Sequence, residues 1–205
     1  MINIRDLKEE DFKNKKVDLH IHTTCSDGEG DYNQILQSAK EKGYKLIAIT
    51  DHNSIEAHKQ IQDGILVTGV EFDCWAGYVF IHLLAYGIDI NHPAMQPFYA
   101  KNKAGTEGVL IRLLPTRSVK KLIKAIHEAG GIAVLAHPAC CWAISLENLV
   151  KNLMKLGLDG IEAYYPYPRF RKFAKFHSAK DVLKIAEKYP ELIRTGGTDF
   201  HGKEF

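Results

Sequence analysis

The sequence is most informative at Val17-Asp-Leu-His-Ile-His-Thr-Thr-Cys-Ser-Asp-Gly28, where the strand pattern of residues 16–22 gives way to a polar loop. Alternate residues of a strand point to the same side, so His20 and His22 face one direction together. Two imidazoles in this arrangement can chelate a metal ion. Asp27 adds a carboxylate in the loop that follows.

Further histidines and carboxylates accompany other segments with strand character. They occur in Thr50-Asp-His-Asn53, Gly69-Val-Glu-Phe72, Ala136-His-Pro138 and Gly197-Thr-Asp-Phe-His201, and His82 stands alone. Histidine together with carboxylate is the ligand set of catalytic zinc, manganese or iron. The donors are too many for a single ion, so the pattern predicts a multinuclear hydrolytic site. Asp51 and His52 face opposite ways in an extended chain, and we expect His52 to be the ligand and Asp51 to support it.

Strand and helix patterns alternate along the chain. We expect strands at residues 16–22, 45–50, 65–72, 78–86, 132–136, 159–163 and 192–196. We expect helices between Asp31 and Gly43 and at residues 54–63, 93–103, 119–129, 146–156 and 178–188, whereas residues 105–115 have no regular pattern. This alternation predicts an α/β fold, and about seven strands would close as a parallel (β/α) barrel. The ligand-type residues fall near the C-terminal ends of the strands, where such barrels carry their chemistry.

Size and composition are those of a globular protein. The chain has 205 residues, 45% hydrophobic and 25% charged, with a formal net charge of +2. We expect one domain over residues 1–205, with a helical extension at residues 1–15. No apolar run approaches the ~20 residues of a membrane helix, and the N-terminus has no apolar leader, so we expect a cytoplasmic protein without a membrane partner. The four cysteines form no C-x-x-C pair, which argues against a disulfide framework. The sequence does not indicate an oligomeric state.

The order of the motifs resembles that of the PHP (polymerase and histidinol phosphatase) superfamily. The motifs are D-L-H-I-H-T-T-C-S-D-G, T-D-H-N, G-V-E-F, the isolated His82, A-H-P and G-G-T-D-F-H-G, and they extend from about Val17 to Gly202. The resemblance implies a distorted, TIM-barrel-like (β/α)7 barrel that binds two to three divalent ions of zinc, manganese or iron. It also implies three ligand sets: His20, His22, Glu71 and Asp199; Glu71, His82 and His137; and Asp27, His52 and His201.

The same resemblance implies a phosphoesterase. Within the superfamily, the segment from His82 to Met95 is similar to the small stand-alone enzymes that act on nucleotides or on the 5′ ends of short RNA. We therefore expect hydrolysis of phosphate monoesters of small metabolites, nucleotides above all, by a hydroxide that bridges two ions, with Glu71, Asp199 and His201 as catalytic groups. Three alternatives remain open: a 5′–3′ exonuclease-like enzyme on short single-stranded RNA or DNA, a histidinol-phosphate phosphatase, and a regulatory module that binds metal or phosphate without turnover.

Residues 164–177 combine arginines and aromatics. Arg169 and Arg171 suit phosphate recognition, and the neighbouring phenylalanines suit base stacking; an amphipathic helix start explains the pattern equally well. His177 precedes a serine, as in members of the family, and is a further candidate for phosphate contact.

Two departures from the family bear on specificity. The interval between His82 and His137 is short, which predicts a reduced lid. The chain also stops at Phe205, so we expect the element that closes the barrel to be missing or supplied otherwise.

Overall fold

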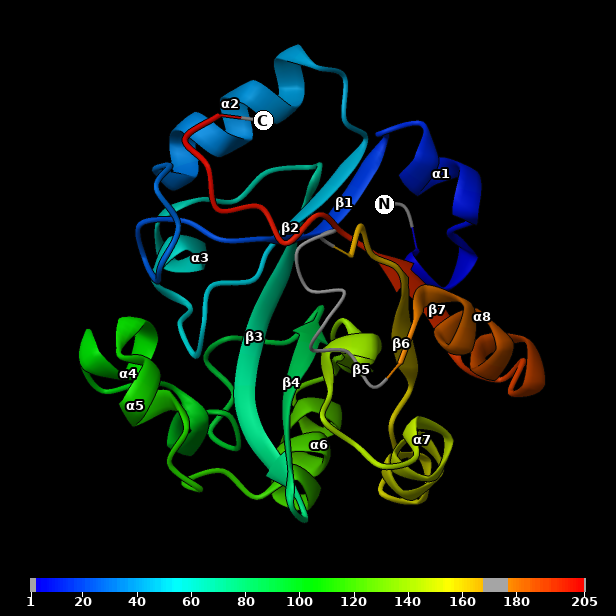
Figure 1. The fold of residues 1–205 in the computed structure, drawn as a ribbon. Helices are drawn as coiled ribbons and strands as arrows, with labels where there is room; N and C mark the ends of the chain where they lie inside the picture. The colour runs from blue at the N-terminus through cyan, green and yellow to red at the C-terminus, as the bar shows by residue number, and fades with distance from the viewer. Residues whose placement is uncertain (1–2, 168–176, 205) are drawn as a thin grey trace.

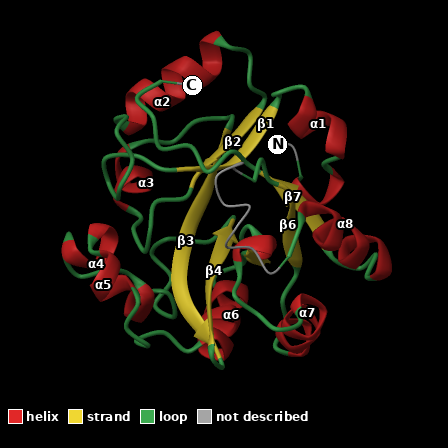
Figure 2. Ribbon diagram, in the orientation of Figure 1, coloured by secondary structure: helices red, strands yellow, loops and turns green. Residues whose placement is uncertain are grey.

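The computed structural model describes residues 3–167 and 177–204. Seven strands follow one another in space in the order of the sequence, and the helices lie around the outside of the strands (Figures 1 and 2). The strands are β1 (Val17–Ile21), β2 (Leu46–Ile49), β3 (Leu66–Ala76), β4 (Val79–Tyr86), β5 (Ile132–Leu135), β6 (Gly160–Tyr164) and β7 (Ile193–Gly196). This arrangement confirms the α/β barrel class. In the part of the chain that the structure describes, no helix has the length and apolar character needed to cross a bilayer.

The helices agree with the sequence patterns, with two exceptions. They are α1 (Glu9–Lys13), α2 (Tyr32–Glu41), α3 (Glu56–Gln60), α4 (Ala104–Glu107), α5 (Val109–Arg112), α6 (Val119–Glu128), α7 (Leu146–Lys155) and α8 (Ala179–Lys188), with single 3-10 turns at Ile4–Asp6, Gln96–Phe98 and Pro138–Cys140. The helix expected at residues 93–103 is wrong, because Pro97 has no N–H to donate and only the 3-10 turn forms there. Residues 105–115, where no regular pattern was found, contain most of α4 and all of α5.

Local signals explain where the elements begin and end. The Asp31 side chain accepts a hydrogen bond from Asn33 N–H, while Gln34 accepts one from Asp31 N–H, so the two residues form a capping box at the start of α2. Gly43 follows the helix with φ of 72°, a left-handed backbone that favours glycine. The expected helical extension before β1 consists of a 3-10 turn and the short α1.

The direction of β4 differs from the all-parallel expectation. It pairs antiparallel with both β3 and β5, whereas the other neighbouring strands are parallel. Residues 77 and 78 join β3 to β4 as a hairpin, and a connection this short can only join antiparallel strands. The start of β4 therefore lies at the same mouth of the barrel as the C-terminal ends of its neighbours.

The barrel closes between the end of β7 and β1. Phe200 N–H donates to the carbonyl oxygen of His20 at 3.1 Å, and His22 N–H donates to the carbonyl oxygen of Phe200 at 2.8 Å. Gly197 permits this approach, because a Cβ at this position would lie 2.3 Å from the Cβ of His20. The closing contact is thus supplied by the residues that follow β7.

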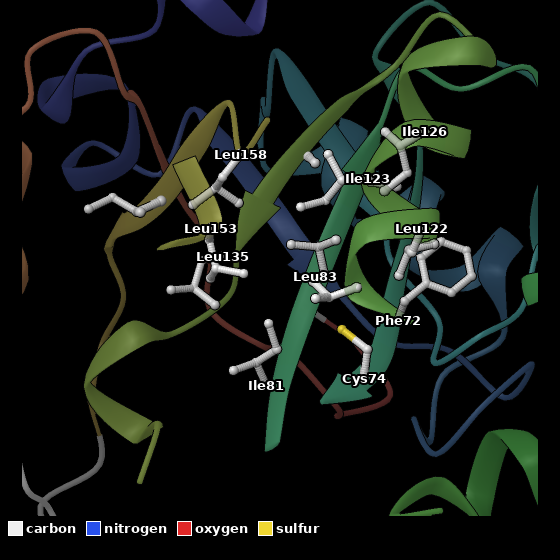
Figure 3. Packing of buried hydrophobic residues seen from close by; sticks show 14 of the residues in the cluster. Phe72, Cys74, Ile81, Leu83, Leu122, Ile123, Ile126, Leu135, Leu153 and Leu158 are labelled. Atoms are coloured by element: carbon white, nitrogen blue, oxygen red, sulfur yellow. The ribbon is translucent and has the colours of Figure 1, made fainter. Parts of the chain in front are cut away.

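Apolar side chains on the outside of the sheet hold the helices in place. Leu122, Ile123 and Ile126 of α6 are fully buried and pack against Phe72 of β3 and Leu83 of β4 (Figure 3). Burial of each such side chain stabilises the fold by roughly 1.5–3 kcal/mol. The resulting scaffold fixes the strand ends from which the polar residues project.

Candidate metal centre

The ligand-type residues of the sequence converge at one mouth of the barrel. His20 and His22 come from the end of β1, Asp27 from the next loop, His52 from the residues after β2, Glu71 from β3, His82 from β4, His137 from the residues after β5, and Asp199 and His201 from those after β7. Contrary to expectation, His82 lies not at the C-terminal end of its strand but at the fourth of its eight residues, and the reversed direction of β4 brings it to the same place.

These residues form groups whose ligand atoms all lie within 4.8 Å of one another. The first group is His20, His22, Glu71 and Asp199; the second is Glu71, His82 and His137; the third is His22, Asp27, His52 and His201; a fourth is His52, Asp73 and His82. Within residues 3–167 and 177–204, none of these groups includes a cysteine.

The spacing in the first group fits a shared ion. His20 Nε2 lies 3.4 Å from both Glu71 Oε2 and Asp199 Oδ1, and His22 Nε2 lies 3.3 and 3.2 Å from the same two oxygens. Both nitrogens are buried, and neither has a hydrogen-bond partner among the described residues. Two ligands of one tetrahedral ion lie roughly 3.3 Å apart when each bond is about 2.0–2.1 Å. Four ligand atoms at this spacing, two of them orphaned, therefore fit a divalent ion.

The second group uses the other oxygen of the same carboxylate. Glu71 Oε1 lies 2.9 Å from His82 Nδ1 and 3.1 Å from His137 Nε2, and these two nitrogens are 3.3 Å apart. Glu71 therefore turns one oxygen to each group and is placed to bridge two ions. Its side chain is 1% exposed, so its geometry is fixed by the surrounding barrel.

Neighbouring acceptors set which imidazole nitrogen can bind a metal. His20 Nδ1–H donates to Glu162 at 2.9 Å, His82 Nε2–H to Asp73 at 3.2 Å, and His201 Nδ1–H to the carbonyl oxygen of Asp199 at 2.8 Å. We assign these protons because each partner oxygen can only accept. The opposite nitrogen of each ring is then left with its lone pair toward the group, as in many metal sites.

Glu162 has a second task in the site. Besides the hydrogen bond from His20 Nδ1–H, Glu162 accepts one from the backbone N–H of His137 at 2.7 Å. Its side chain is completely buried. His137 has φ of 26°, and Asp199 also has a positive φ, 53°; such backbone is uncommon outside glycine and is typical of functional sites. Sequence reasoning left Glu162 outside the ligand set, and the structure places it behind the ligands, where it fixes two of them.

The third group is contacted by a residue that the sequence did not single out. Asp27 Oδ1 lies 3.5 Å from His22 Nδ1 and 3.3 Å from His201 Nε2. Arg112 of α5 enters from outside the group and donates to Asp27 Oδ2 at 3.0 Å and to His52 Nε2 at 2.6 Å. No motif surrounds Arg112 in the sequence, and only its position in the fold reveals it.

Two other buried aspartates hold the loops. Asp51 accepts hydrogen bonds from Thr23 N–H and from the Thr23 hydroxyl, each at 2.7 Å, and from the Ser26 hydroxyl at 2.7 Å. Asp18 accepts a hydrogen bond from Thr198 N–H at 3.0 Å and a second from the Thr198 hydroxyl. Asp51 thus supports the loop that carries Asp27, and it belongs to none of the four ligand groups.

Protons and metal ions compete for these ligands. Burial alone would lower the pKa of His22, but the nearby carboxylates of Asp199 and Glu71 outweigh burial and raise that pKa to about 9. Burial likewise opposes ionisation of Glu71, yet the charges of His82 and His20 hold its pKa well below the usual range. The carboxylates are therefore ionised at neutral pH. Their negative charge favours positive charge beside them, which either protonated imidazoles or a metal ion can supply.

Of the three predicted substrate-binding residues, the structure describes His177 alone. Arg169 and Arg171 fall outside the described residues. His177 Nε2 is 2.7 Å from the carbonyl oxygen of Ala143, and its contact with phosphate stays a prediction. Tyr165, from the segment that follows β6, reaches the site: its hydroxyl donates to Asp199 Oδ2 at 2.9 Å.

Comparison with known proteins identifies the family. The family model described as PHP domain matches residues 18–194, and the chain belongs to this family. It is 37% identical over 206 residues to the 5′-3′ exoribonuclease Rnm of Salmonella typhimurium, covering 91% of this chain and 67% of that protein. It is 23% identical over 259 residues to the phosphoribosyl 1,2-cyclic phosphate 1,2-diphosphodiesterase of Eggerthella lenta, covering 91% and 94%.

Solved structures agree on the fold. An amidohydrolase from Chromobacterium violaceum with bound sulfate superposes with a TM-score of 0.73 at 20% identity, covering 91% of this chain and 88% of that one. A protein from Bifidobacterium adolescentis, assigned as a metal-dependent phosphoesterase, gives a TM-score of 0.68 at 22% identity with the same coverage. The family match and the clustered ligands confirm the enzyme class expected from the sequence: the chain is a hydrolase of phosphoric ester bonds.

Proposed function

We propose that the protein hydrolyses phosphate monoesters of small metabolites, nucleotides above all, with two or three divalent ions of zinc, manganese or iron. The observation that carries this proposal is Glu71, whose Oε2 faces His20 and His22 while its Oε1 faces His82 and His137. One carboxylate shared by two complete ligand groups is the arrangement that a binuclear hydrolytic centre requires.

Metal ions would supply chemistry that the side chains alone lack. When bound, divalent ions lower the pKa of water toward ~7 and stabilise charge on phosphoryl oxygens. The chain itself contributes the positions of the ligands. Tyr165 donates to Asp199 Oδ2, while Asp199 Oδ1 faces the first group, so the carboxylate cannot turn away from it without losing a hydrogen bond.

Exposure indicates the side from which substrate approaches. The side chains of His20 and His22 are fully buried, whereas Asp199 is 22% exposed and His201 is 39% exposed. Asp199 and His201 are therefore the candidates to contact the leaving-group oxygen. We assign the leaving-group proton to neither, because both also lie in ligand groups.

A cavity beside the centre supports a nucleotide as substrate. It has a volume of about 520 Å³ and is lined in part by Cys25, Asn53, Tyr99, Lys101 and Lys103. None of the candidate ligands lines this cavity, and its connection to the centre is through Cys25 and Asn53, which belong to the loops that carry Asp27 and His52. The volume lies in the range of sites for small ligands. The ring of Tyr99 could stack on a base, and the ammonium groups of Lys101 and Lys103 could bind a further phosphate.

The second candidate is a 5′–3′ exonuclease acting on short RNA or DNA. The specific observation in its favour is the 37% identity to the exoribonuclease of Salmonella typhimurium. Residues 164–177, with Arg169 and Arg171 among aromatics, could contact such a strand. Oligonucleotide affinity that falls steeply with salt would favour this candidate. Among the residues that the structure describes, no feature favours histidinol phosphate, and the ligand groups argue against a module without turnover.

The test is phosphate release from a panel of substrates by manganese- or zinc-loaded protein. The panel contains nucleoside monophosphates, nucleoside 3′,5′-bisphosphates, histidinol phosphate and a short 5′-phosphorylated RNA. We expect the wild-type protein to turn over nucleotides and His137→Asn to lose this turnover. His127 lies on α6 outside the centre, so the matched control His127→Asn should retain normal turnover. Stepwise shortening of the RNA without nucleotide turnover would replace the first candidate by the second. Metal binding without any turnover would refute both.

A further inference from the structure

Arg112 occupies an unusual position for a cationic side chain. It ends the short helix α5, yet its guanidinium is only 9% exposed and lies against residues of the third and fourth groups. Its Nη1 donates to Asp27 at 3.0 Å, and its Nη2 donates to His52 Nε2 at 2.6 Å. A fixed positive charge thus sits where family resemblance places a third metal ion.

The contact with His52 excludes a metal ion on the same atom. An imidazole nitrogen without a proton has one lone pair, which lies in the plane of the ring. Arg112 Nη2–H uses the lone pair of His52 Nε2, while His52 Nδ1 faces Glu71 Oε2 at 3.1 Å. His52 can therefore bind either the guanidinium or an ion through Nε2, but not both.

Asp73 holds Arg112 in this position. Its two carboxylate oxygens accept from Arg112 Nε at 3.2 and 3.0 Å, and one of them also accepts from Nη2 at 3.1 Å. Asp73 is 0% exposed and is itself fixed by the amide of Asn53 and by His82. Paired hydrogen bonds from a guanidinium to a buried carboxylate are strong and directional. The guanidinium is thus part of the built structure of the site and not a surface side chain folded over it.

We propose that Arg112 takes the place of the third ion, so that the centre holds two divalent ions, in the first and second groups, and Asp27 and His52 bind the guanidinium. This inference rests on the proposed function, because it presupposes that the two groups around Glu71 bind metal. It changes the chemistry of the site, since a guanidinium attracts a phosphate oxygen but cannot coordinate water or lower its pKa. The guanidinium also carries a single positive charge, one fewer than the divalent ion whose place it takes.

The test is the number of ions per chain, measured by native mass spectrometry and elemental analysis after loading with excess Mn²⁺ or Zn²⁺ and desalting. We expect two ions in the wild-type chain and three in Arg112→Met, because loss of the guanidinium frees Asp27 and His52 beside His22 and His201. Arg117→Met is the matched control: Arg117 donates to the carbonyl oxygen of Phe98, outside the centre, so this variant keeps two ions.

Asp27→Asn provides a second measurement if Arg112→Met does not fold. Asp27 is a ligand of neither ion under the proposal, so this variant keeps two ions, whereas a three-ion centre would lose one. Three ions in the wild-type chain, or two in a folded Arg112→Met, would overturn the assignment of Arg112 while leaving the proposed function intact. Fewer than two ions in the wild-type chain would overturn the metal centre, and with it both proposals.

Discussion

Replacing Glu162 by glutamine tests whether residues behind the ligands control metal binding. Glu162 accepts two hydrogen bonds, from His20 Nδ1–H at 2.9 Å and from His137 N–H at 2.7 Å, one on each carboxylate oxygen. Glutamine has the same shape but only one carbonyl oxygen, so its NH2 group must face one of the two donors. Either His20 loses the partner that fixes its tautomer, or the backbone of His137 loses its acceptor.

The magnitude follows from these two contacts. Loss of a partner behind a metal-binding histidine weakens metal affinity about 10- to 100-fold, which corresponds to about 1.4–2.7 kcal/mol. The unpaired buried donor lowers the free energy of unfolding by a further ~1–3 kcal/mol. Metal affinity is measured by competition with a fluorescent chelator, and stability of the metal-free chain by urea unfolding.

Glu187→Gln is the matched control, because Glu187 is exposed on α8, away from the centre. It should change neither quantity measurably. If Glu162→Gln binds metal within twofold of the wild-type affinity while remaining folded, the assigned role of Glu162 is refuted.

Four further predictions follow. His137→Asn should lose metal and turnover yet keep its circular dichroism spectrum, since asparagine tolerates the positive φ at this position; full activity with unchanged metal content would contradict this. The raised pKa of His22, about 9 without metal, means that a proton must leave when an ion binds, so affinity should rise from pH 7 to pH 9; a flat titration corrected for the chelator would contradict it. Arg169→Ala with Arg171→Ala should raise KM for nucleotides, and an unchanged KM would rule out phosphate recognition by these arginines. Leu122→Ala on the buried face of α6 should lower the free energy of unfolding by about 2–5 kcal/mol in urea.

The barrel could be predicted because its signals are local. Strand and helix periodicity, the capping box at Asp31 and the glycine at residue 43 each depend on a few neighbouring residues. The direction of β4 was missed because it depends on the length of the β3–β4 connection, and β3 extends to Ala76, four residues beyond its expected end, which leaves only residues 77 and 78 between the strands. The helix expected at residues 93–103 is wrong, because Pro97 cannot donate a backbone hydrogen bond and only a 3-10 turn forms there.

The candidate site likewise contains residues that local sequence signals reveal and others that only the tertiary fold reveals. Histidines and carboxylates next to strand ends could be recognised from residue type and spacing, and the structure brings all nine of them together. Arg112 has no such signal, whereas Asp73 and Glu162 are carboxylates near the ends of expected strands that were not assigned as ligands. Asp73 lies opposite His82 across β3 and β4, and Arg112 arrives from a helix more than thirty residues further along the chain. Contacts of this kind are set by tertiary packing, which no short motif encodes.

The most direct measurement is phosphate release from a nucleoside monophosphate by wild-type protein and Glu71→Gln, each stripped with a chelator and then reloaded with Mn²⁺. Glu71 lies in both of the groups on which the proposed function depends. We predict turnover only in the reloaded wild-type protein, with none in the stripped protein and none in Glu71→Gln. Turnover by the stripped protein, or full turnover by Glu71→Gln, would contradict a phosphoesterase centre built on this carboxylate.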